Sequence, residues 1–314
     1  MVTGLSMDTV IAGNTLADSR VCVDLVEVYD SDVQEFGRKA AILGQMIRQG
    51  IQVPTGLCFS HSILHTLYGS TSDSHTEKSM EYSHQMQPEA LSGFILDNVH
   101  LKFGYSWMKR TSLVVRSSAS VENSKAASFA GIFQSVPSVN SEPQLVESVT
   151  SCWNSQFADH VSKYMQRMGL SGFPVRLGII VQEMVVGDVS GVVFTRTPIL
   201  PRRNATLLIE AAYGLCTPVV QGTCNPDRYW VDIQTFRTYA QQAESVQSFE
   251  TYVELSEQVG SKQSGCLSAG EVKRIARTSL FIERLFDYPQ DIEWTLRGGE
   301  LFILQSRPLT SLSL

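Results

Sequence analysis

The stretch that most constrains the fold is residues 291–308, near the end of the 314-residue sequence. Polar and apolar residues alternate on both sides of Gly298-Gly299, which is the pattern of a β-hairpin with one buried face. A two-residue loop would mix polar and apolar residues on each face, so we predict a three-residue loop over 298–300. The predicted apolar face consists of Ile292, Trp294, Leu296, Phe302 and Leu304.

The other face of the predicted hairpin carries charged and amide side chains. In the predicted register Glu293 lies opposite Gln305, and Asp291 lies opposite Arg307. Carboxylate and amide oxygens beside a fixed guanidinium suit a divalent metal that is bound together with a phosphate chain. An amphipathic edge hairpin with a solvated ion pair is the alternative, and spacing alone does not decide between the two.

The composition is typical of a globular protein. Hydrophobic residues make up 43% of the chain and charged residues 18%, and the length is sufficient for two lobes. The net charge of -6 and the lack of a basic stripe argue against a surface that coats nucleic acid. The six cysteines are scattered without a CxxC pair, which argues against a zinc site and for a reducing cytoplasm. We also expect no membrane span, because no apolar run is long enough, and no signal peptide, because the N-terminus carries Asp8 and has no basic region.

Three regions are predicted along the chain. Residues 1–20 are small and polar and are expected to form a flexible lead-in. Residues 21–190 are expected to form a first lobe region, and residues 191–314 a second lobe region that ends in the hairpin. Two apolar strands, 177–186 and 191–195, are predicted to pair through a short turn. Further predicted elements are a strand at 53–59, helical residues at 143–168, strands at 207–212 and 229–233, and a helix that begins at a Ser268–Glu271 capping box.

A helix is predicted from Gly37 to Gly50, with Gly50 as its stop. Lys39 then lies in the first turn, where the helix dipole disfavours a cation unless an anion binds nearby. A solvated surface lysine is the alternative.

Two segments before residue 132 suit an anion. Arg116 lies in the β-rich stretch Leu113–Ser120, and an arginine on a buried strand needs an anionic partner. Residues 126–131 are small apart from Phe129, so their N–H groups could approach a phosphate closely, although an ordinary turn is the alternative. His61 and His65 have helical spacing, but no third metal ligand lies near them in sequence, so a metal there is not favoured.

Five motifs follow one another along the chain in a recognisable order. They are Gly37–Gly44, Val115–Ala119, Ser128–Gly131, Gln182–Val185 with Gly191–Arg196, and Asp291–Trp294 with Leu304–Pro308. Together they resemble the N-terminal ATP-binding domain of the pyruvate phosphate dikinase and phosphoenolpyruvate synthase family, which is also found in rifampin phosphotransferase-like enzymes. Each motif alone is weakly specific, whereas the ordered set is specific.

The resemblance implies an α+β fold of the ATP-grasp type, with two lobes and the nucleotide in the cleft between them. It implies that Lys39, Arg116 and Arg307 are the catalytic cations, and that ATP and Mg²⁺ are the cofactors. The residues expected to contact the nucleotide phosphates are Lys39, Arg116, Ser128, Phe129, Ala130, Gly131 and Arg307.

The resemblance also assigns the adenine and metal contacts. The backbone of Gln182, Glu183 and Met184 would meet the adenine at a hinge strand. Glu293 and Gln305 would be the metal ligands.

The chain departs from the family pattern at two motifs. Arg38 and Ala40 stand where the family usually has glycine, which predicts a stiffer turn. Cys216-Thr217 stands where the family usually has Gly-Glu, so a carboxylate is missing there.

Family enzymes continue into a domain with a phosphorylated histidine, whereas this sequence ends shortly after Pro308. We therefore expect a phosphotransferase module that passes phosphate from Mg-ATP to a histidine on a separate chain or domain. One alternative is a stand-alone small-molecule kinase or ATP-dependent ligase. Another is a nucleotide-sensing scaffold with a degraded site.

Overall fold

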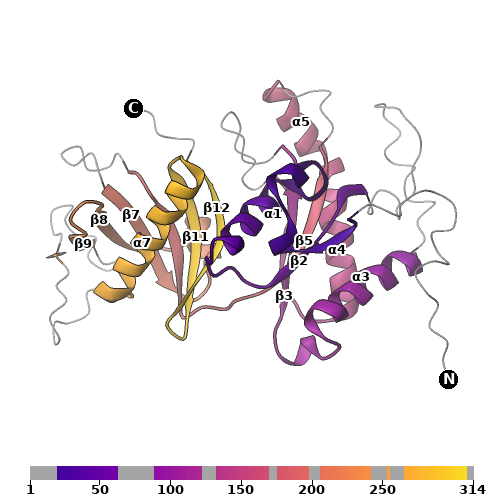
Figure 1. Cartoon of the computed structure of the whole chain (residues 1–314), viewed down its shortest axis with the longest axis horizontal. Coiled ribbons are helices and arrows are strands. Elements are labelled where there is room, and N and C mark those ends of the chain that lie inside the picture. Colours follow the sequence, from indigo (N-terminus) through magenta and orange to yellow (C-terminus); the bar gives the residue numbers. More distant parts are fainter. Residues whose placement is uncertain are drawn as a thin grey trace.

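The computed structural model describes residues 20–62, 88–121, 132–169, 175–197, 206–241, 253–254 and 265–309. The described residues form two antiparallel sheets of five and seven strands, which stand side by side along the long axis of the molecule (Figure 1). The predicted α+β class with two lobes is confirmed. Residues 1–19 of the predicted lead-in lie outside the described residues. None of the described helices is long and apolar enough to cross a membrane.

The first sheet has the strand order β1-β2-β5-β3-β4. An apolar core beneath it contains Leu57, Val115 and Ile179 from the strands and Ile95 and Val149 from two covering helices. The strands of this lobe are β1 (Cys22–Asp24), β2 (Gly56–Phe59), β3 (Leu113–Ala119), β4 (Ser135–Val139) and β5 (Leu177–Glu183). Its helices are α1 (Val33–Arg48), α3 (Pro88–Phe103), α4 (Glu142–Asn154) and α5 (Asp159–Arg167), with short 3₁₀ turns at Leu25–Glu27, Asp30–Asp32, Trp107–Lys109 and Ser155–Phe157.

The helix predicted over 143–168 is divided in two. α4 ends at Asn154 and α5 begins at Asp159, because Ala158 between them has the extended values φ -70° and ψ 142°. Apolar residues recur at helical spacing on both sides of Ala158, so the period alone does not reveal the break.

Helix α1 has a break at Gly37, where the sequence predicted the helix to begin. Gly37 has φ 80° and ψ 165°, so the helical run starts again after it. The backbone N–H of Ala40 then donates to Ser118 Oγ at 3.0 Å, which caps the new helix start from strand β3. A Cβ atom at Gly37 would lie 1.9 Å from Ser118 O, so only glycine permits this close approach.

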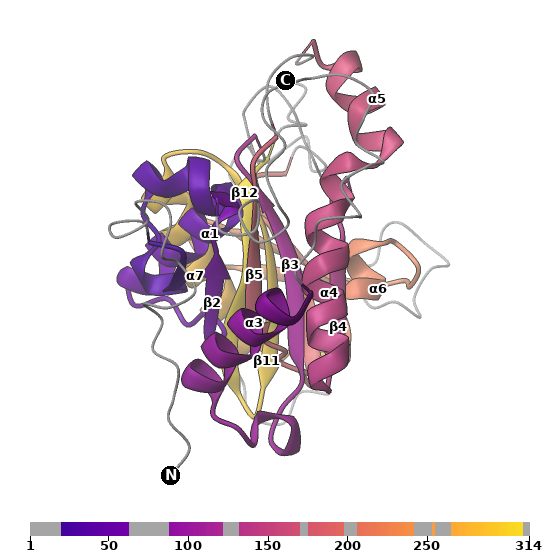
Figure 2. The same ribbon diagram turned by 90° about the vertical axis from the view of Figure 1, so that its right-hand side faces the viewer.

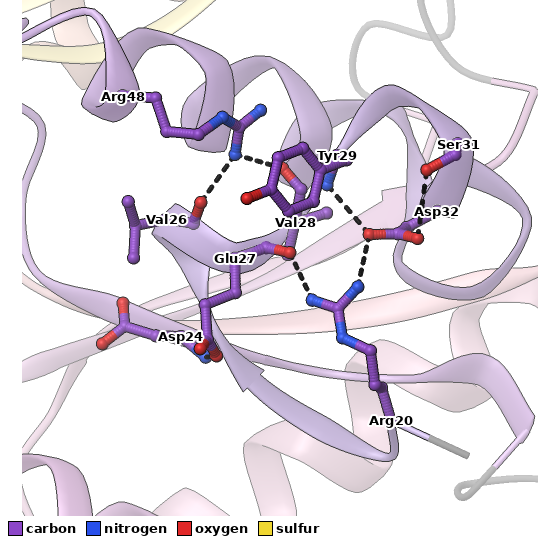
Figure 3. Close-up of polar contacts among 9 residues, drawn as sticks. All are labelled: Arg20, Asp24, Val26, Glu27, Val28, Tyr29, Ser31, Asp32 and Arg48. Carbon is purple, nitrogen blue, oxygen red and sulfur yellow. Dashed lines mark hydrogen bonds and ion pairs between the residues drawn. The ribbon is translucent and has the colours of Figure 1, made fainter. Parts of the chain in front are cut away.

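The other end of α1 is tied to the segment that follows β1 (Figure 3). The guanidinium of Arg48 donates to Val26 O at 2.6 Å and to Val28 O at 2.7 Å. It also lies 4.1 Å from the centre of the Tyr29 ring. Both ends of α1 are therefore fixed within the first lobe.

The second sheet has the strand order β10-β9-β8-β7-β6-β11-β12, and helix α7 covers one of its faces (Figure 1). The predicted capping box is confirmed: Glu271 N–H donates to Ser268 Oγ, and Ser268 N–H donates to Glu271 Oε2. The elements are β6 (Val189–Phe194), β7 (Thr206–Tyr213), α6 (Thr217–Val220), β8 (Asp227–Asp232), β9 (Thr238–Gln241), β10 (Val253–Glu254), α7 (Ala269–Phe286), β11 (Gln290–Arg297) and β12 (Glu300–Pro308).

The predicted pairing of the strands at 177–186 and 191–195 is wrong. β5 lies in the first sheet between β2 and β3, whereas β6 lies in the second sheet between β7 and β11. The chain passes from one sheet to the other between Glu183 and Val189. Two apolar runs with a short connection resemble a hairpin in sequence, and only their different sheet partners tell them apart.

The hairpin of β11 and β12 is confirmed, including the pairs Glu293–Gln305 and Asp291–Arg307. The predicted three-residue loop is wrong, however, because Arg297 pairs directly with Glu300. The two-residue loop has positive φ at both positions, 56° at Gly298 and 80° at Gly299, as a tight primed turn requires.

The predicted pairs nevertheless form because β12 contains a β-bulge. Trp294 pairs with Ile303 while Glu293 pairs with Gln305, so Leu304 is an extra residue. The bulge reverses the alternation along β12. Ile303 therefore joins the core with Trp294, and Leu304 packs beside Val192 on the other face. The predicted placement of Leu304 and Phe302 on the face of Trp294 is thus wrong, because Leu304 is the bulge residue and Phe302 pairs with Thr295.

Candidate functional site

The polar pairs of the hairpin are part of a longer row of cross-strand partners on the second sheet, which is polar except at Val192. The row runs across five neighbouring strands, with each residue paired to the next. Its members are Gln305 on β12, Glu293 on β11, Val192 on β6, Glu210 on β7 and Arg228 on β8. Directly paired residues point to the same side of a sheet, so this row shares one face. The opposite face of the same strands packs on α7 in the apolar core.

Asp291 and Arg307 form a partly buried ion pair beside this row. Arg307 Nε and Nη2 donate to Asp291 Oδ2 at 2.8 and 2.6 Å, and Asp291 is only 8% exposed. Burial raises the pKa of Asp291, Arg307 opposes that rise, and the Glu210 carboxylate adds to it. We did not assign Asp291 to the site from sequence, although its predicted place opposite Arg307 was the signal for it.

Arg116 reaches from the first sheet to the hairpin. Viewed along the long axis, the β11–β12 hairpin lies behind β5 and β3 (Figure 2). From β3, Arg116 Nη1 donates to Leu304 O at 2.7 Å, and Nη2 donates to Gln305 Oε1 at 2.5 Å. Both partners are neutral oxygens, so the expected anionic partner is not supplied by these two contacts. They place Arg116, predicted to bind phosphate, in contact with Gln305, predicted to bind the metal.

Lys39 approaches the same strand from α1. It is 7% exposed, and its Nζ donates to Ser117 O at 2.8 Å. The alternative of a solvated surface lysine is therefore wrong. Ser117 follows Arg116 in β3, so Lys39 is hydrogen-bonded to the residue next to Arg116.

The hinge residues Gln182, Glu183 and Met184 are tied to the first lobe. Gln182 Nε2 donates to Pro54 O at 2.8 Å. The N–H of Glu183 donates to Thr55 O at 2.8 Å, and that of Met184 donates to Ser112 O at 3.0 Å. These two amides are therefore already committed to backbone carbonyls.

The far side of the hinge is tied to the second lobe. The N–H of Asp188 donates to Leu296 O at 2.7 Å, and Asp188 Oδ2 accepts from the N–H of Gly298 at 2.8 Å. The connection thus runs from a strand end fixed in one lobe to a residue clamped by the hairpin tip of the other.

The metal prediction rests on two oxygen donors. Glu293 and Gln305 are direct partners on β11 and β12, and both are partly exposed. Within the described part of the chain no group of three or more His, Cys, Asp and Glu residues could hold a metal ion. Two hard oxygen ligands that leave the other positions to water and phosphate nonetheless suit Mg²⁺, which is seldom caged by protein alone.

The two remaining sequence predictions fall partly outside the described residues. The loop of Ser128, Phe129, Ala130 and Gly131 lies outside them, between β3 and β4. His65 does too, whereas His61 accepts a hydrogen bond from the N–H of Leu177 at 3.3 Å through Nδ1.

The departure at Cys216-Thr217 places a thiol beside the hairpin. Cys216 Sγ donates to Gly191 O at 3.3 Å and packs with Val192 and Val219. Burial raises the pKa of Cys216, with Glu293 adding to the rise, so the thiol stays neutral. Thr217 is exposed at the start of α6.

Comparison with known proteins extends these observations. The family profile "Pyruvate phosphate dikinase, AMP/ATP-binding domain" matches residues 33–314. A rifampicin phosphotransferase of Streptomyces sviceus is 29% identical over 319 residues, covering 93% of this chain and 36% of that protein. A probable phosphoenolpyruvate synthase of Methanocaldococcus jannaschii is 30% identical over 330 residues, covering 96% and 28%. The chain thus spans about a third of the length of these relatives.

Among solved structures, a D-alanine-D-alanine ligase from Coxiella burnetii is similar with a TM-score of 0.34 and 11% identity. The match covers 86% of this chain and 46% of the ligase. A likeness this slight carries no conclusion about activity.

Proposed function

Because this chain belongs to the family of pyruvate phosphate dikinase AMP/ATP-binding domains, we propose that it binds Mg-ATP between its two sheets and transfers a phosphoryl group. The contact that carries the proposal is the one between Arg116 of β3 and Gln305 of β12. It joins a cation of one lobe to an oxygen ligand of the other.

The three cations would neutralise the phosphate chain. Lys39 and Arg116 approach from the first lobe, and Arg307 stands on the second with its orientation set by Asp291. Phosphoryl transfer needs little beyond positioning and charge stabilisation, which fixed cations provide. The loop of Ser128, Phe129, Ala130 and Gly131 would cover the phosphates.

Glu293 and Gln305 would hold the magnesium ion. When bound, the ion would draw charge from the phosphate oxygens. Glu293 supplies the anionic ligand, and its neighbour Asp291 is already paired with Arg307.

The adenine would meet the backbone at the end of β5, over Gln182, Glu183 and Met184. Because the amides of Glu183 and Met184 donate within the first lobe, carbonyl groups of this segment and the next amide, that of Val185, would pair with the base. This extends the predicted contact by one residue.

The phosphate acceptor would be a histidine on a separate chain or domain, as the likeness to a phosphoenolpyruvate synthase favours. The alternative is direct transfer to a small molecule by a stand-alone kinase or ligase. The missing carboxylate at Thr217 favours that alternative. All six cysteines are free thiols, in keeping with the proposed cytoplasmic location.

Nucleotide product analysis tests the proposal. The chain is incubated with Mg-ATP and candidate acceptors, and the nucleotides are separated. AMP with phosphate would support the dikinase route, and ADP would support direct transfer. A chain that binds no ATP in calorimetry, with or without Mg²⁺, would refute both.

A further inference from the structure

The β-bulge in β12 turns two backbone groups toward the first lobe. Among the described strands, β12 stands at the edge of its sheet, next to β11. The N–H of Ile303 donates to Gln52 O at 2.8 Å, and the carbonyl of Leu304 accepts from Arg116 at 2.7 Å. In a regular strand the N–H and C=O of one residue point to the same side, so the extra residue creates this arrangement.

Arg116 also donates a hydrogen bond to the side-chain oxygen of Gln305. The distance from Nη2 to Gln305 Oε1 is 2.5 Å. This is the oxygen that the proposed function gives to the metal, since the other atom of the amide is a donor. Gln305 Oε1 would thus have two positively charged partners, the guanidinium of Arg116 and the metal ion.

The guanidinium and the metal ion compete for this oxygen. A magnesium ion binds oxygen at about 2.0–2.1 Å, so the ion and the guanidinium would lie within about 5 Å of each other on one oxygen. Like charges at that distance repel strongly where water is partly excluded. The bond to Leu304 O involves a different atom, so the arrival of a metal does not disturb it directly.

We propose that Arg116 is an interlobe latch that masks Gln305 until a magnesium nucleotide binds. Nη2 then exchanges Gln305 Oε1 for a phosphate oxygen, while Nη1 stays anchored on Leu304 O. The exchange makes metal binding depend on the phosphate, because only a phosphate offers the displaced guanidinium a better partner. The latch rests on the proposed function and assigns it an order of events.

The latch predicts an unusual sign for Arg116→Ala. Removing a phosphate cation weakens ATP binding, yet it should tighten the binding of metal alone by unmasking Gln305. The probe is Mn²⁺, titrated into the full chain without nucleotide and followed by electron paramagnetic resonance. We expect Arg116→Ala to tighten Mn²⁺ binding by roughly 10-fold to 100-fold, the range for a hydrogen bond to a charged group.

A double-mutant cycle separates masking from general charge repulsion. In a Gln305→Ala background, Glu293 still offers a carboxylate, but there is no amide oxygen to unmask. Arg116→Ala should therefore tighten Mn²⁺ binding clearly less there than in the Gln305 background. Equal tightening in both backgrounds, no tightening, or no Mn²⁺ binding by any variant would overturn the latch.

Hydrogen exchange gives a second readout that does not depend on metal. The amide of Ile303 donates across the lobe junction, so its exchange without nucleotide should accelerate in Arg116→Ala. Gln52→Ala is the matched control, since it removes an exposed interlobe bond to Glu300 but no charge. It should leave Mn²⁺ affinity unchanged. A chain that binds ATP but fails the cycle has no latch, whereas a chain that binds no ATP refutes the proposed function itself.

Discussion

The two lobes hold their cations in different ways. In the first lobe, Lys39 donates to Ser117 O, and Arg116 donates to Leu304 O and Gln305 Oε1, all of them neutral oxygens. In the second lobe, Arg307 is paired with the buried carboxylate of Asp291. A cation on neutral partners keeps its full charge for a ligand, whereas one on a carboxylate is largely compensated. Arg116 therefore keeps its positive charge for a ligand, whereas Arg307 is held in a fixed geometry by Asp291.

The largest expected effect concerns the geometry of the second lobe. Arg307→Ala should lower turnover by about 100-fold or more, as the loss of a fixed donor to developing charge does. Arg297→Ala, on the exposed tip of the same hairpin, is the matched control. It removes a surface ion pair of 3.7 Å with Glu183, whose proposed role uses only its backbone, so turnover should change little. Nucleotide product formation measures both. Similar losses in the two variants would mean that the hairpin contributes only its fold.

The next effect concerns the charge of the first lobe. Lys39→Met should weaken ATP binding by roughly 10-fold to 100-fold, the range for a bond to a charged group. Adenosine carries no phosphate, so its affinity should not change. Calorimetry with both ligands measures this difference.

The neighbouring Arg38→Ala is the control for that experiment. Arg38 pairs with Asp30 on the surface, and an exposed pair of this kind contributes little. ATP affinity should therefore stay near that of the native chain. An equal loss with ATP and adenosine in Lys39→Met would assign Lys39 to packing instead of phosphate binding.

The close packing of α1 on β3 can be tested through stability. Gly37→Ala should destabilise the fold by about 2 kcal/mol or more, since both its positive φ and its contact with Ser118 oppose a side chain. Gly50 shares the positive φ, but nothing lies within 4 Å of its Cβ position. Gly50→Ala therefore measures the cost of a side chain at positive φ without a clash. That variant should lose roughly 1 kcal/mol. Urea unfolding measures both, and equal losses would remove the role of close approach.

The smallest effect is the pH dependence of Asp291. Its pKa in the folded chain is raised above the usual 3.8, so the folded state keeps this proton to higher pH than the unfolded state does. The contribution of Asp291 to stability should therefore fall as pH rises through the window just above that usual value. Urea unfolding of the native chain and Asp291→Asn, compared from pH 4 to pH 7, measures it. A contribution that rises with pH would show that Arg307 outweighs burial.

The resemblance to the ATP-binding domain is confirmed by the family match, and the α+β class is confirmed by the two sheets and their helices. The sequence alone determined features that depend on nearby residues. The capping box at Ser268, the glycine at the break in α1 and the alternation of the hairpin arms all follow from local backbone preference and period.

Only the tertiary structure decided which distant groups meet. At the bulge, the carbonyl of Leu304 accepts from Arg116, 188 positions away, and the Leu304 side chain packs beside Val192. In sequence, one extra residue in a strand looks the same as one extra residue in the loop. The prediction therefore gave the correct polar pairs but placed the extra residue in the turn. The burial of Lys39 and the separation of β5 from β6 likewise depend on sheet partners that no local window contains.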